Sequence, residues 1–276
     1  MRNARMRVAR IAVVAALATA ALAVVVVPAE AATKKTAVAP ITVLISNDDG
    51  VGAPGIDALV EAVRVLPKTK VVVVAPATNQ TGIGGKVTEG ATVQGGPSTT
   101  ASGYAATAVQ GTPADSVNYA FDTMKIRPTV TLTGANIGQN LGPNVDVSGT
   151  VGAARASAQH GVPALAVSAQ IATPDYPLAS KLAVAWLTEH RAALAKSAKA
   201  KQQVPPTEIT SLNVPTCPGS AIRGLYQTTP APPGTPDSVL SAVNCTSTAT
   251  TYPNDVAAFN DGWATETPLP IRPASQ

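Results

Sequence analysis

Two adjacent carboxylates, Asp48 and Asp49, stand between a short apolar run and Gly50. Like charges held this close raise each other's pKa unless a cation joins them. Carboxylate, amide and hydroxyl oxygens suit hard cations such as Mg²⁺ or Mn²⁺ better than histidine or cysteine ligands do. The pair therefore indicates a divalent-metal site, and a capped Asn-Asp-Asp-Gly turn without a ligand is the structural alternative.

Two later segments hold further oxygen ligands. Residues 79–82, Asn-Gln-Thr-Gly, follow a run of valines and could complete a coordination shell, bind phosphate or form an ordinary loop. Residues 134–142 are rich in Gly and Asn, and Ser148, Gly149 and Thr150 then lead into a predicted helix. Glycines let the backbone approach a ligand, and hydroxyls with free amides at a helix start favour phosphate.

Hydrophobic periodicity predicts the elements that position these residues. Buried strands are expected at 41–46, 70–75, 129–133, 164–168 and 208–214, where apolar and β-branched residues gather. Helices are expected from Pro54, from 150 to 160 and from 177 to 200. This order predicts a Rossmann-like, doubly wound and mostly parallel α/β sheet. Ligands of such sheets bind beyond the carboxyl ends of the strands, where segments 47–50, 79–82 and 134–140 fall.

The N-terminus resembles a secretory signal. Arginines precede an apolar run at 11–27, and Ala29 and Ala31 are the small residues that a signal peptidase reads. We expect a cleaved signal peptide at 1–31, a mature leader at 32–40, a catalytic domain at 41–214 and a C-terminal extension at 215–276. The expected location is secreted or extracytoplasmic, without membrane attachment after cleavage; a retained N-terminal anchor is the alternative.

Cleavage would remove four Arg and one Glu, which lowers the formal net charge from +4 to +1. A near-neutral mature chain has no clustered Lys and Arg with which to displace counterions from a polyanion. The charge pattern therefore excludes a nucleic-acid duplex as partner. Only 3% of the residues are aromatic, so rings on which a base can stack are scarce.

Cys217 and Cys245 are the only two cysteines. In an exported chain such a pair is more often a disulfide than a reactive site, and closing this loop should stabilise the fold by about 3 kcal/mol. The Pro, Thr and Ser content around them predicts loops about an edge hairpin, and 90–103 reads as an irregular segment. His160 and His190 are expected at helix ends or on the surface, and no Gly-x-Ser-x-Gly motif indicates a serine hydrolase.

Four ordered segments and a closing one carry a family resemblance. They read ISNDDGVGAPGIDAL (45–59), VVAPATNQTGIGGKVT (73–88), GTPADSV (111–117), TGANIGQNLGPNVDVSGTVGAA (133–154) and DVAAFNDGWATETPL (255–269). The chain resembles the survival protein SurE family of 5′/3′-nucleotidases. The resemblance implies a Rossmann-like domain, a C-terminal hairpin exchanged between subunits, and a homodimer or homotetramer. It further implies divalent-metal hydrolysis of nucleoside monophosphates.

The resemblance also implies roles for individual residues. Carried over by position, the metal ligands are Asp48, Asp49, Thr81 and Asn136, with Mg²⁺ or Mn²⁺ as the cofactor. Thr81 replaces the serine usual in the family, and Gly52 stands where the family often has His.

From these positions follows an expected mechanism. Asp48, Asp49 and Asn136 are the expected catalytic residues, and one of the two carboxylates takes the proton of the attacking water. The phosphate would be held by Asn140, Ser148, Gly149 and Thr150. The alternatives are a broad acid phosphatase or exopolyphosphatase, and a non-catalytic secreted nucleotide-binding protein.

Overall fold

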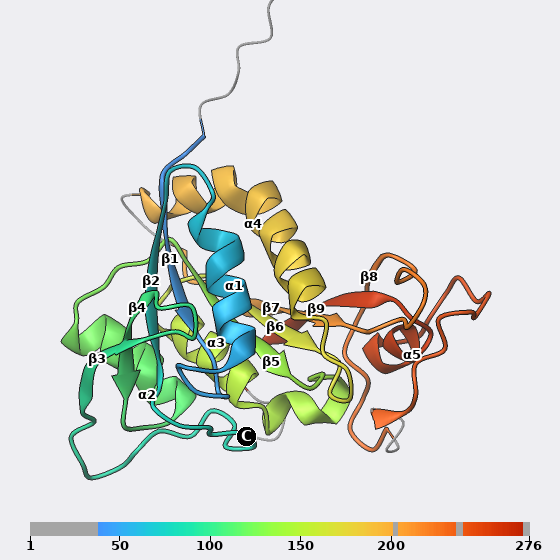
Figure 1. Ribbon diagram of the computed structural model, residues 1–276, viewed down its shortest axis with the longest axis horizontal. Helices are drawn as coiled ribbons and strands as arrows, with labels where there is room; N and C mark the ends of the chain where they lie inside the picture. The colour runs from blue at the N-terminus through green and yellow to red at the C-terminus, as the bar shows by residue number, and fades with distance from the viewer. Residues whose placement is uncertain (1–37, 201–203, 236–239, 273–276) are drawn as a thin grey trace, which may run out of the picture. The chain divides into compact units, whose positions relative to one another are not determined.

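The computed structural model describes residues 38–200, 204–235 and 240–272, so the expected signal peptide at 1–31 lies outside the described residues. Within them, nine strands form one sheet in the order β3-β4-β2-β1-β5-β6-β7-β9-β8 (Figure 1). The strands are β1 (Ile41–Ser46), β2 (Thr69–Pro76), β3 (Gly95–Thr99), β4 (Ala105–Val109), β5 (Val130–Ile137), β6 (Ala164–Ala169), β7 (Glu208–Val214), β8 (Leu225–Gln227) and β9 (Ala264–Pro270). The six from β4 to β7 in that order run parallel, whereas β3 is antiparallel to β4 and β9 to β7.

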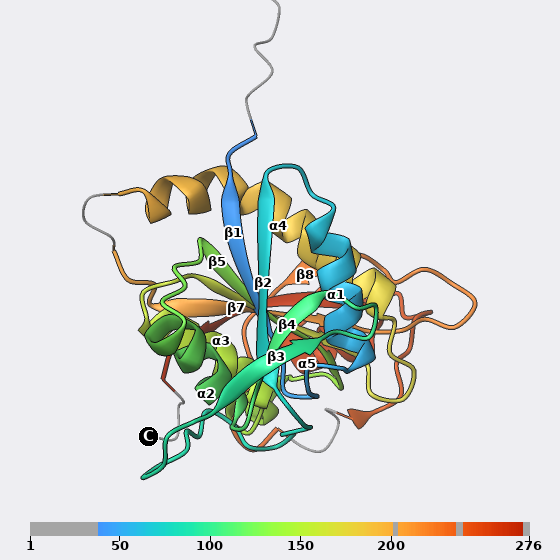
Figure 2. The same ribbon diagram turned by 60° about the vertical axis from the view of Figure 1, so that its left-hand side comes forward.

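Helices cover both faces of this sheet. Helices α1 (Pro54–Arg64) and α4 (Tyr176–Ala198) lie on one face, and α2 (Pro113–Asn118) and α3 (Gly149–Gln159) on the other (Figure 2). Because both faces are buried, the central strands are continuous apolar runs, and the expected α/β class with a mostly parallel sheet is confirmed. No helix in the described ranges has both the length and the apolar character needed to cross a membrane.

Local chemistry explains where the helices begin. Proline at the first position starts α1, and its residues Ile56, Leu59 and Val63 are fully buried against the sheet. Helix α3 consists mainly of Gly, Ala and Ser, so its backbone approaches the sheet closely. The Ser148 side chain caps α3 by accepting a hydrogen bond from the amide of Val151.

Two expectations about the chain's irregular parts are corrected by the structure. Segment 90–103 contains β3, which forms an antiparallel pair with β4. The edge hairpin expected in the C-terminal part is absent from the described residues, because β8 and β9 are parallel neighbours. The chain leaves β8, passes through the short helix α5 (Asp255–Asn260) and returns as β9 between β7 and β8.

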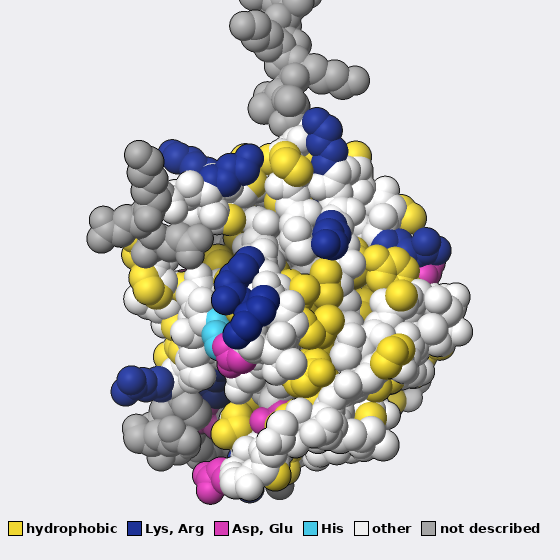
Figure 3. Space-filling view, turned by 90° about the vertical axis from the view of Figure 1, so that its left-hand side faces the viewer, with side chains coloured by type: hydrophobic (Ala, Val, Ile, Leu, Met, Phe, Trp, Pro, Cys, Tyr) yellow, Lys and Arg dark blue, Asp and Glu magenta, His cyan; other side chains and the backbone are white. Residues whose placement is uncertain are grey.

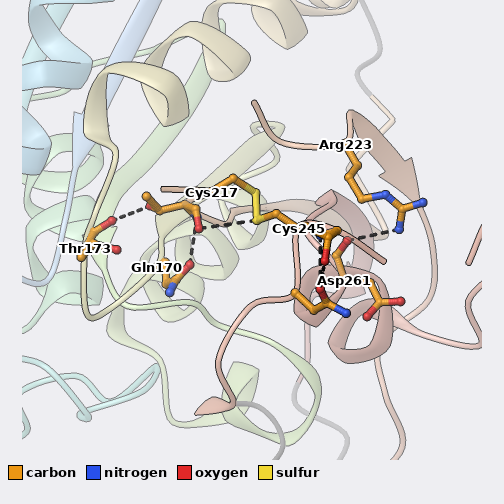
Figure 4. The surroundings of a disulfide bond; sticks show 9 residues. Gln170, Thr173, Cys217, Arg223, Cys245 and Asp261 are labelled. Atoms are coloured by element: carbon orange, nitrogen blue, oxygen red, sulfur yellow. Dashed lines mark hydrogen bonds between the residues drawn. A yellow bond between two sulfur atoms is a disulfide. The ribbon is translucent and has the colours of Figure 1, made fainter. Parts of the chain in front are cut away.

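Cys217 and Cys245 are joined by a disulfide, with their Cα atoms 5.7 Å apart (Figure 4). The neighbouring Thr216 amide donates a hydrogen bond of 2.9 Å to the side-chain oxygen of Gln170, which follows β6. The disulfide thus fastens the loop before α5 to the chain that leaves β7.

Charged side chains are scattered over the face that carries the β3 edge (Figure 3). Figure 3 shows that Lys and Arg side chains form small separate groups there, with neutral surface between them. Among the described residues visible in this view, Lys and Arg form no continuous stripe.

Candidate active site

Strand order brings three distant polar segments to one edge of the sheet. Strand β1 lies between β2 and β5 and runs parallel to both, so the segments that follow them meet. The amide of Gln80 donates a 2.7 Å hydrogen bond to the carbonyl of Asp48. The amide of Ile137 donates one of 3.1 Å to Oδ2 of Asp49. This edge is therefore the candidate active site.

Asp48 is the more deeply placed of the two carboxylates, at 2% exposure. The Thr150 hydroxyl donates a 2.6 Å hydrogen bond to its Oδ1, and a Cβ on Gly149 would lie 2.7 Å from the Asp48 Cβ. Helix α3 thus begins directly against this side chain. Burial raises the pKa of Asp48, and the Thr150 hydrogen bond opposes that rise.

Asp49 is half-buried beside it. Burial, and then the negative charge of Asp48, raise the pKa of Asp49 to about 6, against the lowering effect of the Ile137 amide. Two carboxylates in this setting destabilise each other's charged form, and a cation between them would remove that cost.

Buried side-chain oxygens without a hydrogen-bond partner in the described part of the chain gather at this edge, and they include Oδ1 of Asp49, Asn136 and Asn47. The amide nitrogen of Asn136 donates to the carbonyl of Gly138 at 2.6 Å, and that of Asn47 to the carbonyl of Gly50 at 2.8 Å. These bonds use the amide nitrogens and leave both amide oxygens without a hydrogen-bond partner among the described residues. Unpaired buried oxygens are costly, and a hard cation is the partner that carboxylate and amide oxygens share.

The oxygen donors therefore fit a divalent cation. Across the described ranges, no group of three or more His, Cys, Asp or Glu side chains could hold a metal. A cation at this edge would depend on two carboxylates together with neutral oxygens. That composition is typical of Mg²⁺ and Mn²⁺ rather than Zn²⁺.

Thr81 lies in the loop after β2, which the hydrogen bond from the Gln80 amide joins to the Asp48 carbonyl. The Thr81 side chain is exposed, and its amide donates a 2.8 Å hydrogen bond to Oδ1 of Asn79. The loop thus places a hydroxyl at the edge where the carboxylates lie.

The residues expected to hold phosphate lie close by, but most of their side chains already bind protein. Thr150 donates to Asp48, and Ser148 caps α3. The side-chain nitrogen of Asn140 donates a 2.8 Å hydrogen bond to the Ser168 hydroxyl. The backbone amide of Asn140 donates to the side-chain oxygen of Asn213. What α3 presents to a ligand is its N-terminal backbone around Gly149.

Sequence reasoning missed a cavity of about 460 Å³ that Asp49 lines. Its lining includes Asp49, Gly52, Asn79, Ile137 and Tyr176. Burial, and then the charge of Asp49, raise the pKa of the Tyr176 phenol. The signal that could have identified Tyr176 is its place in the segment after β6, at the edge where ligands bind.

The two histidines lie in other settings, as expected. His160 follows α3, stacks on Phe121 with ring centroids 4.4 Å apart, and contacts Asn118 through Nε2. His190 stacks on Trp186 within α4 and contacts the Trp186 carbonyl through Nδ1.

Fold and site together define a doubly wound α/β protein with a candidate oxygen-donor cation site beyond its central parallel strands. Residues 43–233 match the family model described as survival protein SurE. The chain belongs to the SurE family. A crystal structure of the SurE protein from Aquifex aeolicus superposes with a TM-score of 0.65 at 25% identity, covering 84% of this chain and 94% of that one.

Two curated relatives show how far the likeness extends. The 5′-nucleotidase SurE of Methanothermobacter thermautotrophicus is 44% identical over 135 residues, which is 48% of this chain and 51% of that protein. The 5′-nucleotidase SurE of Pelobacter propionicus is 36% identical over 184 residues, or 66% and 68% of the two chains. The match thus spans about half the length of the first relative and two thirds of the second.

Proposed function

We propose that this chain is a metal-dependent phosphomonoesterase that hydrolyses nucleoside 5′- and 3′-monophosphates to nucleoside and phosphate. The observation that carries the proposal is the set of unpaired buried oxygens on Asp49 and Asn136 beside the buried Asp48. Similarity to proteins named 5′-nucleotidase SurE supports the choice of substrate.

Asp48, Asp49, Thr81 and Asn136 would hold Mg²⁺ or Mn²⁺ in this proposal. When bound, such a cation supplies Lewis-acid stabilisation of phosphoryl charge and lowers the pKa of a coordinated water. The donor set contains no residue that would favour a softer metal.

The chain's own residues orient and bind. The Thr150 hydroxyl and the close backbone of Gly149 fix Asp48 in one position. The N-terminus of α3 points backbone N–H groups and the positive end of its dipole toward this edge, which favours a phosphate. One of the two carboxylates, Asp48 or Asp49, accepts the proton of the attacking water, because both histidines are engaged with aromatic rings and polar partners elsewhere.

A single assay separates this proposal from its alternatives. Phosphate release is measured from 5′- and 3′-nucleoside monophosphates, p-nitrophenyl phosphate and polyphosphate, each with Mg²⁺, Mn²⁺ or a chelator. We expect metal-dependent turnover of nucleotides that falls at least about a hundredfold in Asp48→Asn and Asn136→Ala. Asp122→Asn, an exposed carboxylate beside His160, is the matched control.

Each contrary result has its own meaning. Turnover in the presence of chelator, or full activity in Asp48→Asn, contradicts the proposed mechanism. Preference for polyphosphate or p-nitrophenyl phosphate favours the exopolyphosphatase or broad phosphatase. Tight nucleotide binding without turnover favours the nucleotide-binding protein.

We further propose that the chain is exported and that it assembles as a homodimer or homotetramer. Export rests on the Arg-rich start, the apolar run and the small residues before position 32. N-terminal sequencing of protein from the culture medium should begin at Ala32, whereas an intact N-terminus in the membrane fraction supports an anchor. Light scattering after gel filtration tests the oligomer, and a monomeric mass contradicts it.

A further inference from the structure

The lining of the cavity beside Asp49 suits an uncharged group. Among the described residues that line it, only Asp49 and Tyr176 are ionisable, and Ala53, Pro54 and Ile137 give it apolar walls. A second anion would find no cation there. At about 460 Å³ the cavity falls within the size range of small-molecule sites.

The cavity adjoins the proposed cation site, because Asp49 belongs to both. The groove of about 360 Å³ along α3 differs on this point, since it is lined by Lys86 and Arg155 and by none of the four candidate metal ligands. A substrate whose phosphate lies at the carboxylates would therefore place its neighbouring group in the cavity rather than in that groove.

Tyr176 supplies the one aromatic ring among the described residues that line the cavity. It is the first residue of α4, and Asp175 caps that helix by accepting from the Leu178 amide at 2.9 Å. Its ring packs against α1, where a Cβ on Gly55 would lie 2.9 Å from Cε1. The half-buried ring is therefore held in place and still faces the cavity.

Gly52 also lines the cavity and adds no side chain to it. It is exposed, and a Cβ built there would meet no atom of the described residues within 4 Å. Its backbone is outside the positive-φ region, so other residues can adopt its conformation. A larger side chain at this position would fill space without straining the chain.

We propose that this cavity is the nucleoside subsite, in which the base stacks on Tyr176 and the glycosyl group lies beside Asp49 and Asn79. The inference rests on the proposed nucleotidase function and identifies the residue that distinguishes nucleotides from other phosphate esters. Tyr176 then acts on specificity, and it takes no part in proton transfer.

The test compares two substrates that share the phosphate and differ in the base: adenosine 5′-monophosphate and ribose 5-phosphate. In Tyr176→Ala we expect kcat/KM for the nucleotide to fall about tenfold, mainly through KM, because base–aromatic stacking is lost. The value for ribose 5-phosphate should stay within about twofold. Tyr176→Phe keeps the ring and should retain the wild-type ratio between the two substrates.

A second pair of variants tests the cavity without touching the aromatic ring. Gly52→Leu should lower the nucleotide's kcat/KM more than that of ribose 5-phosphate, because it fills the cavity. Gly96→Leu is the matched control, since a Cβ on Gly96 also meets nothing within 4 Å in the described part of the chain and Gly96 lies on β3. It should leave both substrates unchanged.

The outcomes separate this inference from the nucleotidase proposal. If the ratio of kcat/KM for adenosine 5′-monophosphate to that for ribose 5-phosphate keeps its wild-type value in both Tyr176→Ala and Gly52→Leu, the proposed subsite is overturned. If the wild-type protein releases phosphate from no ester, the nucleotidase proposal fails, and calorimetric binding of adenosine decides the subsite instead. Adenosine binding that is weaker in Tyr176→Ala supports it, and no adenosine binding overturns it.

Discussion

Replacing Thr150 with Val removes one buried hydroxyl and almost nothing else. That hydroxyl is fully buried and donates a 2.6 Å hydrogen bond to Oδ1 of Asp48, whose carboxylate is 2% exposed. A buried hydrogen bond to a charged group contributes about 1.5 to 3 kcal/mol, so we expect about 2 kcal/mol of lost stability when Asp48 is ionised.

The loss should depend on pH with a definite sign. The Thr150 bond favours ionised Asp48 and lowers its pKa against the effect of burial. Without the hydroxyl the pKa rises further, so the variant loses more stability at a pH above the folded pKa of Asp48 than at a pH below it, where protonation leaves only a neutral bond worth about 1 kcal/mol. Metal affinity at neutral pH should fall about tenfold, because proton and cation compete for the same carboxylate.

Thr133→Val is the matched control. Its hydroxyl is also fully buried, and it donates a 2.8 Å bond to the Thr150 carbonyl instead of a carboxylate. Urea unfolding at both pH values in chelator gives the stabilities, and calorimetric titration with Mn²⁺ gives the affinities. If both variants lose equal stability at both pH values and bind Mn²⁺ equally well, our account of Asp48 is refuted.

The pKa of Asp49 in the folded protein is about 6, against an ordinary 3.8. The free energy of unfolding of the metal-free protein should therefore fall by about 1 to 2 kcal/mol between pH 4 and pH 7, relative to that of Asp49→Asn, allowing for partial exposure. Melting curves in chelator measure this, and a gap between the two proteins that does not change with pH would contradict it. The Cys217→Ala, Cys245→Ala double variant should unfold with about 3 kcal/mol less stability, and an oxidised wild type whose urea midpoint matches that of the double variant would argue against a structural disulfide. Asp255→Asn should cost about 2 kcal/mol, since its carboxylate accepts from the amides of Gly142, Ala231 and Val256. The exposed Asp122→Asn should stay within about 0.5 kcal/mol of wild type in the same urea experiment, and an equal loss in both would show that the buried bonds do not matter.

The central strands and helices could be predicted because their own residues require burial. The run Ile41–Ser46 is apolar and β-branched and cannot remain in water, and Pro54 begins a helix with one apolar face. Strand β3 reads Gly-Gly-Pro-Ser-Thr and has no such preference, so its pairing with β4 decides its conformation. Strand β9 contains two prolines and becomes a strand through its hydrogen bonds to β7.

The sequence by itself determined that Asp48 and Asp49 follow a buried strand, because apolar runs and turn residues act locally. It also determined the SurE family, since ordered motifs survive changes elsewhere in the chain. Only the tertiary structure decided that Thr150 donates a hydrogen bond to Asp48 across 102 residues and that Tyr176 lines a cavity beside Asp49. It alone also decided that the Asn136 oxygen is buried without a hydrogen-bond partner among the described residues. The reason is physical: strand order decides which segments meet at the edge of the sheet, and no local pattern along the chain encodes that order.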